Sequence, residues 1–85
     1  MWAGMNKEIA TKILKAIDLH QLSYIEPSLG DRGYYKKSLE ECFDEVFEED
    51  PMREIYFWST MFSWNSTIDV CRGILGKNTS NDEGM

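Results

Sequence analysis

A helix start signal followed by a complete apolar helix face is the feature that most constrains this chain. Ser38 and Glu41 have the spacing of a capping box, in which the serine caps the helix and the glutamate reaches back to the serine backbone. The apolar residues that follow recur at i, i+3, i+4, i+7 and i+8: Leu39, Cys42, Phe43, Val46 and Phe47. This period predicts an α-helix with one buried side, ending near Glu49.

Another amphipathic helix is predicted from Lys7 to about His20. Asn6 precedes it as a plausible N-cap, and Glu8 lies in the first turn, where the helix dipole favours a negative charge. Its apolar stripe contains Ile9, Ala10, Ile13, Leu14 and Ile17.

The apolar pattern in the C-terminal part of the sequence predicts one long helix from Pro51 to about Leu75, which Gly76 ends. Asp50 is a suitable cap, and proline is well tolerated at the first helical position. Six apolar residues follow at spacings of 4, 3, 4, 3 and 4: Phe57, Met61, Trp64, Ile68, Cys71 and Leu75. The alternative is a break between Trp64 and Thr67, with Ser66 or Thr67 capping a fourth helix.

This long helix has a second apolar surface. Met52, Ile55, Phe62 and Val70 lie opposite the first stripe, and Trp58 lies to one side. Ser59, Ser66 and Gly73 add small residues on the second side, which would let another backbone come close. A helix that is apolar on two sides is either central in its domain or shared with a partner. The candidate partner- or dimer-binding residues are Tyr56, Trp58, Phe62 and Trp64; the alternative is that they belong to the core.

The segment from Gln21 to Lys37 is the least regular. Pro27, Gly30 and Gly33 interrupt any helix, and tyrosines flank the turn on both sides. We expect an ordered loop held by its tyrosines, with a short hairpin as the alternative.

The predicted fold is an all-α bundle of three helices, or four if the last one breaks, with a long C-terminal helix and an irregular Tyr-rich loop after the first. With 85 residues and 42% hydrophobic residues, the chain is long enough for one folded domain. We expect a flexible head at residues 1–5, a helical domain at 6–76 and a disordered tail at 77–85.

The net charge of −6 is concentrated in the helix after Ser38. Between Ser38 and Asp50 there is no basic residue, and the acids are Glu40, Glu41, Asp44, Glu45, Glu48, Glu49 and Asp50. Because the apolar side faces the core, the six acids from Glu40 to Glu49 should cover about 14 Å of the outer side. They form either a solvated face that maintains solubility or a docking face for a basic protein surface.

No residue pattern indicates catalysis. His20 is the only histidine. Cys42 and Cys71 both lie on apolar stripes, where reduced, buried thiols are expected, and a disulfide between the helices is the alternative. The turn from Gly30 to Gly33 lacks the lysine and hydroxyl residue of a phosphate-binding loop. We therefore expect no catalytic residue, no metal site and no cofactor.

These observations favour a protein-binding role in the cytoplasm. The sequence pI of about 4.6 argues against direct nucleic-acid binding, and no apolar stretch approaches the length of about 20 residues that a membrane span needs. Shortness, acidity and lack of catalytic motifs resemble the general style of phage-encoded inhibitors, anti-CRISPR proteins and bacteriocin immunity proteins. We expect an inhibitor or adaptor that binds a basic, nucleic-acid-handling protein; the alternative is an assembly protein that forms a homodimer through its aromatic helix.

Overall fold

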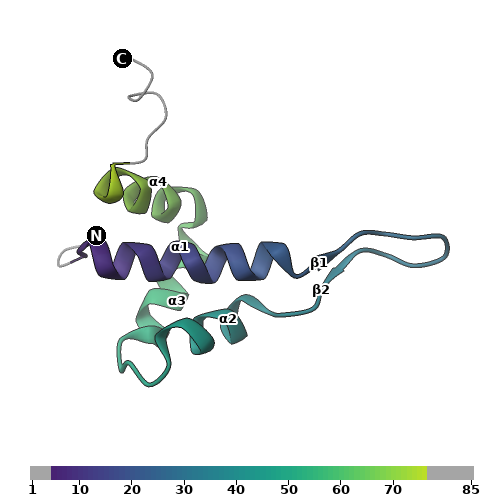
Figure 1. Cartoon of the computed structure of the whole chain (residues 1–85), viewed down its shortest axis with the longest axis horizontal. Coiled ribbons are helices and arrows are strands. Elements are labelled where there is room, and N and C mark those ends of the chain that lie inside the picture. The colour runs from purple at the N-terminus through teal and green to yellow at the C-terminus, as the bar shows by residue number, and fades with distance from the viewer. Residues whose placement is uncertain (1–4, 77–85) are drawn as a thin grey trace, which may run out of the picture.

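The computed structural model describes residues 5–76, which form four α-helices and one two-stranded sheet. The elements are α1 (Lys7–Leu22), β1 (Tyr24–Ile25), β2 (Tyr34–Tyr35), α2 (Leu39–Phe47), α3 (Arg53–Phe62) and α4 (Trp64–Leu75). α1 runs through the middle with α2 on one side and α4 on the other, and α3 crosses from α2 to α4 (Figure 1). The mostly helical fold agrees with the prediction.

The first two helices begin where their caps were predicted. The Asn6 side chain accepts a hydrogen bond from the Ile9 backbone N–H at 2.9 Å. At α2, the Ser38 hydroxyl accepts from the Glu41 N–H at 3.0 Å, and the Glu41 carboxylate accepts from the Ser38 N–H at 2.9 Å. Each cap satisfies backbone donors that would otherwise lack a partner at a helix start.

The core is organised around α1. The buried apolar side chains are Ala10, Ile13, Ala16 and Ile17 of α1, Cys42, Phe43 and Phe47 of α2, Phe57 of α3 and Cys71 of α4. The Phe43 ring stacks on Phe47 and meets the Phe57 ring edge-on at 5.8 Å between centroids. Met5, the only described residue of the predicted head, contacts the Cys71 sulfur at 3.9 Å. The rest of the head and the predicted tail lie outside the described residues.

The expectation of an irregular loop after α1 was wrong, because the tyrosines form a hairpin. Tyr24 pairs with Tyr35 and Ile25 pairs with Tyr34 in antiparallel register. Gly33 lies against this pair, where a Cβ atom would overlap the Tyr24 hydroxyl and force that side chain to move. The hairpin projects from the end of α1, well beyond the helical body (Figure 1).

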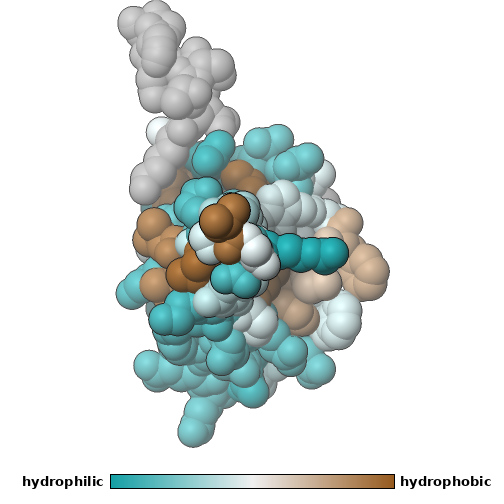
Figure 2. Space-filling view, turned by 90° about the vertical axis from the view of Figure 1, so that its right-hand side faces the viewer, coloured by the Kyte–Doolittle hydropathy of each residue, from teal (hydrophilic) through white to brown (hydrophobic). Residues whose placement is uncertain are grey.

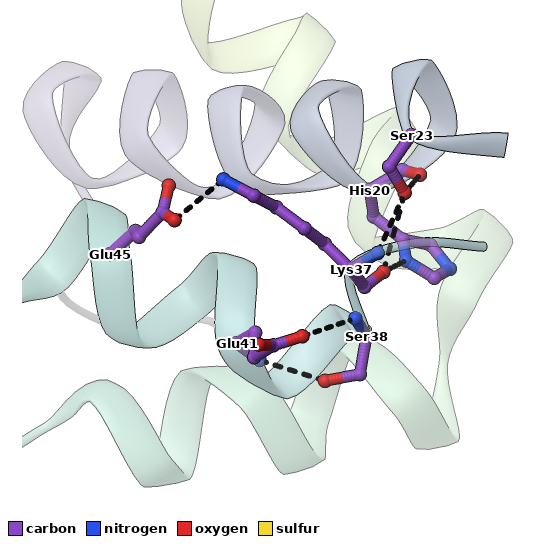
Figure 3. A network of polar contacts seen from close by, with 6 residues as sticks. All are labelled: His20, Ser23, Lys37, Ser38, Glu41 and Glu45. Carbon is purple, nitrogen blue, oxygen red and sulfur yellow. Dashed lines mark hydrogen bonds and ion pairs between the residues drawn. The ribbon is translucent and has the colours of Figure 1, made fainter.

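Polar contacts fix the base of the hairpin to α1. The His20 ring nitrogen Nδ1 lies 2.7 Å from the Lys37 carbonyl oxygen, and the same ring stacks on Tyr35 at 4.1 Å. The Ser23 hydroxyl donates to the His20 carbonyl at 2.7 Å and accepts from the Lys37 N–H (Figure 3). These contacts use the only histidine of the chain in a structural role that the sequence did not indicate.

The prediction of one helix from Pro51 to Leu75 was also wrong. The helix is interrupted at Ser63, whose backbone (φ −135°, ψ 57°) is not helical. Ser63 still donates its N–H to the Ser59 carbonyl and accepts from the Thr67 N–H. The break lets α3 contact α2 while α4 turns to contact α1. Met61, expected on the buried stripe, is consequently exposed. Neither Ser66 nor Thr67 is the cap; both lie within α4, which ends at Gly76 as predicted.

The turn between α2 and α3 differs by a few residues from the prediction. α2 ends at Phe47, and α3 begins at Arg53 after a turn in which the Asp50 side chain accepts from the Met52 N–H at 2.9 Å. Glu48 caps α2 with a positive φ of 50° and ψ of −115°. A residue with a Cβ atom is strained in this region, whereas glycine adopts it readily.

This geometry predicts that Glu48→Gly is more stable than Glu48→Ala. Both variants remove the same charge, but only glycine removes the Cβ atom that opposes a positive φ. We expect a difference of about 1 kcal/mol in the free energy of unfolding, or about 4–8 °C in Tm. Thermal unfolding followed by circular dichroism measures it, and an alanine variant as stable as the glycine variant would contradict the strain at Glu48.

Candidate functional site

The acids of α2 do not form one free face. Glu41 is used in the capping box, and the Glu45 carboxylate accepts from the Lys37 ammonium at 2.6 Å (Figure 3). This ion pair raises the pKa of Lys37. Asp44 pairs with the Arg53 guanidinium of α3 at 2.8 Å. These three predicted docking residues therefore hold the base of the hairpin, the start of α2 and the start of α3.

The remaining predicted acids, Glu40, Glu48 and Glu49, are exposed and make no side-chain hydrogen bond or ion pair within residues 5–76. Glu48 contributes only its backbone carbonyl, which accepts from Arg53 at 3.1 Å. In the view from the hairpin end, the lower part of the molecule, at the level of α2, is mainly hydrophilic (Figure 2). The acids of α2 that are free of structural contacts are therefore fewer than the sequence indicates.

The four predicted aromatic residues separate into two pairs. Tyr56 and Trp64 are half-buried and pack against the core. Trp58 and Phe62 point outward, with 46% and 80% of their surface exposed, and their rings stack at 5.8 Å between centroids. The second pair forms a candidate contact surface, and the first pair is structural.

The exposed aromatic pair forms part of an open groove of about 440 Å³ that runs along α3. It is lined by Glu54, Ile55, Trp58, Ser59, Phe62 and Ser63, and is called the α3 groove below. Ile55 is 53% exposed. An exposed apolar surface that is contiguous and edged by polar residues is typical of an interaction site, whereas single exposed apolar residues are not.

Glu54 connects the α3 groove to the acidic surface of α2. It also lines a smaller neighbouring pocket of about 230 Å³, together with Glu40, Asp44 and Arg53 among others. Sequence reasoning did not single out Glu54, although its spacing to Trp58 and Phe62 is four residues in each step and indicates one side of a helix. The candidate site is therefore an apolar groove with carboxylates at one end.

The other chemically interesting side chains lie away from this site. Cys42 and Cys71 are buried and unbridged, as predicted. Burial raises the pKa of the Cys71 thiol to about 11, and burial followed by the Glu45 carboxylate raises that of Cys42. A thiol needs a lowered pKa and access to act as a nucleophile at neutral pH, so neither cysteine is suited to that role.

No metal site or membrane-spanning helix occurs in the described part of the chain. Within residues 5–76, no three side chains of His, Cys, Asp or Glu are placed to hold a metal ion. In the same range, no helix has both the length and the apolar character needed to cross a bilayer. Comparison with models of known protein families, with curated proteins and with solved structures found no match.

The raised thiol pKa values predict that stability falls as the pH rises above the ordinary cysteine value of 9.0. Unfolded thiols ionise near that value while the buried ones stay neutral, so unfolding releases protons and is favoured as pH rises towards about 11. We expect the urea midpoint to decline between about pH 9 and 11. The Cys42→Ala/Cys71→Ala double variant should decline less over the same range; an equal decline would show that the thiols do not contribute.

Proposed function

We propose that this chain is a non-enzymatic protein-binding module whose contact surface is centred on the α3 groove. The observation that carries the proposal is the outward-facing apolar side of α3, formed by Ile55, Trp58 and Phe62. Protein interfaces typically have a buried aromatic centre with a polar rim, and tryptophan is among the residues that contribute most to binding. Fully burying a side chain of the size of Phe62 contributes about 1.5–3 kcal/mol.

The charge around the groove favours a basic partner. Glu54 lies in the groove, and Glu40 lies in the pocket beside it. Lys or Arg on a partner would complement these carboxylates and would also speed association. Basic surfaces of this kind are common on nucleic-acid-handling proteins, so the role that fits best is an inhibitor or adaptor of such a protein.

Self-association through α3 is the second candidate, and it is supported by the same exposed aromatic pair. In a two-fold dimer the same patch meets itself, so each copy would bring the same acidic residues to the interface and the two copies would repel each other. The net charge of −6 adds to this repulsion. A basic partner is therefore the better match for the groove.

The proposal predicts that Phe62→Ala releases the partner while Leu22→Ala does not. Leu22 is the matched control, because it is 82% exposed but lies at the end of α1. Tagged full-length protein is used to capture partners from the native host, and the captured protein is then purified for affinity measurement. We expect Phe62→Ala to weaken binding by about 10- to 100-fold, as for an interface hot spot, with the affinity of Leu22→Ala unchanged.

The charge component is tested with the same purified partner. Glu54→Gln should weaken binding and reduce its salt dependence, whereas Glu26→Gln in the hairpin segment should do neither. Equal affinities for Phe62→Ala and the native protein would contradict the assignment of the groove. Recovery of only the tagged protein with its own copies, lost in Phe62→Ala, would instead support the homodimer.

A further inference from the structure

The residues that line the α3 groove form two rows of unequal height. Glu54, Trp58 and Phe62 follow one another at four-residue spacing, and the Trp58 and Phe62 rings stack with an interplanar angle of 26°. This row is a continuous, tall ridge on the outer side of α3. Residues four apart form the ridges through which helices pack against one another.

The second row is low over most of its length. Ile55, Ser59 and Ser63 also follow at four-residue spacing, and the two serines are short side chains beside the aromatic ridge. From Glu54 to Ser63 the rows extend about 14 Å along the helix axis. A groove between two such rows matches the i, i+4 ridge of another helix over about two and a half turns.

One end of the groove carries a negative charge that has no counterpart in the described structure. Glu54 makes no side-chain hydrogen bond or ion pair within residues 5–76, and Glu40 beside it is equally unpaired. Arg53, the nearest basic residue in sequence, is already paired with Asp44 and the Glu48 carbonyl. A Lys or Arg on the occupant would therefore meet free carboxylates at this end.

We propose that the α3 groove receives an amphipathic α-helix of a partner protein, with apolar residues at helical spacing along the aromatic ridge and a Lys or Arg facing Glu54. This inference rests on the proposed function and adds the form and chemistry of the occupant. Helix-in-groove recognition uses anchors at i, i+3, i+4 and i+7, which the length of this groove accommodates.

Synthetic peptides provide the test. The probe is a helical peptide of about 18 residues made of Leu, Ala and Lys, with Leu at i, i+3, i+4 and i+7. One control has the same composition with the leucine stripe scrambled, and another has Glu in place of Lys. Calorimetry at physiological salt should give the striped basic peptide an affinity at least about tenfold higher than either control. Equal binding of the striped and scrambled peptides would overturn the inference.

A large side chain at Ser59 distinguishes binding in a shaped groove from nonspecific binding to an exposed apolar surface. Ser59→Leu places a large side chain where the partner helix would lie, and should reduce binding of the striped peptide by about tenfold or more. Thr11→Leu adds the same side chain to an exposed position of α1 and should bind like the native protein. Ser59→Ala keeps the groove open and should also bind normally, which controls for the fold. Unchanged or tighter binding by Ser59→Leu would contradict helix docking.

Failure of this inference is separable from failure of the proposed function. If the natural partner is lost in Phe62→Ala but the striped peptide has no advantage, the groove binds a partner that is not an amphipathic helix. If the natural partner binds Phe62→Ala normally, the α3 groove is not the binding surface, and both proposals fail.

Discussion

The change of backbone direction at Ser63 determines which surfaces of this protein face each other and which face outward. Because the helix stops there, α3 remains against α2 through Phe57, and α4 returns to α1 through Cys71. α1 supplies the central apolar stripe that both flanking helices cover. α3 is left with neighbours on one side only, and its second apolar side, which contains Trp58 and Phe62, has no cover within the described residues.

The charged residues are divided in the same way, between those paired within the fold and those left unpaired at the surface. Asp44 and Glu45 form ion pairs that connect α2 to α3 and to the segment before α2. Exposed pairs of this kind contribute little individually, typically about 0–1 kcal/mol, so their importance is in orientation and not in stability. Glu40 and Glu54 remain unpaired beside the groove, so the free negative charge lies next to the free apolar surface.

The sequence predicted most of what depends on local interactions. The starts of α1 and α2 follow from Asn6 and from the pair Ser38 and Glu41, because caps involve residues only three positions apart. A break in this region, between Trp64 and Thr67, was only the alternative prediction, and its actual position at Ser63 was not predicted. Helical spacing of apolar residues continues across Ser63, so the pattern favours one helix, whereas the break is accompanied by the packing of α4 on α1.

The same limit applies to the site. Periodicity indicated that α3 has two apolar sides and that acids occupy the outer side of α2. It did not indicate which of these acids form ion pairs with Arg53 and Lys37. The Lys37–Glu45 pair joins residues eight positions apart and the Asp44–Arg53 pair joins residues nine apart, so neither follows from helical spacing. Likewise, Tyr35, which pairs with Tyr24, stacks on the ring of His20 at the end of α1, a contact between distant residues that no local rule predicts.

The central claim is that the outward side of α3 is the binding surface, and amide chemical-shift mapping tests it most directly. Isotope-labelled full-length protein is titrated with the purified partner, and backbone signals are followed residue by residue. The account predicts that the largest changes fall between Glu54 and Ser63, with smaller ones at Glu40. Changes confined to the hairpin from Tyr24 to Tyr35, or to Glu48 and Glu49 with α3 unaffected, would contradict it.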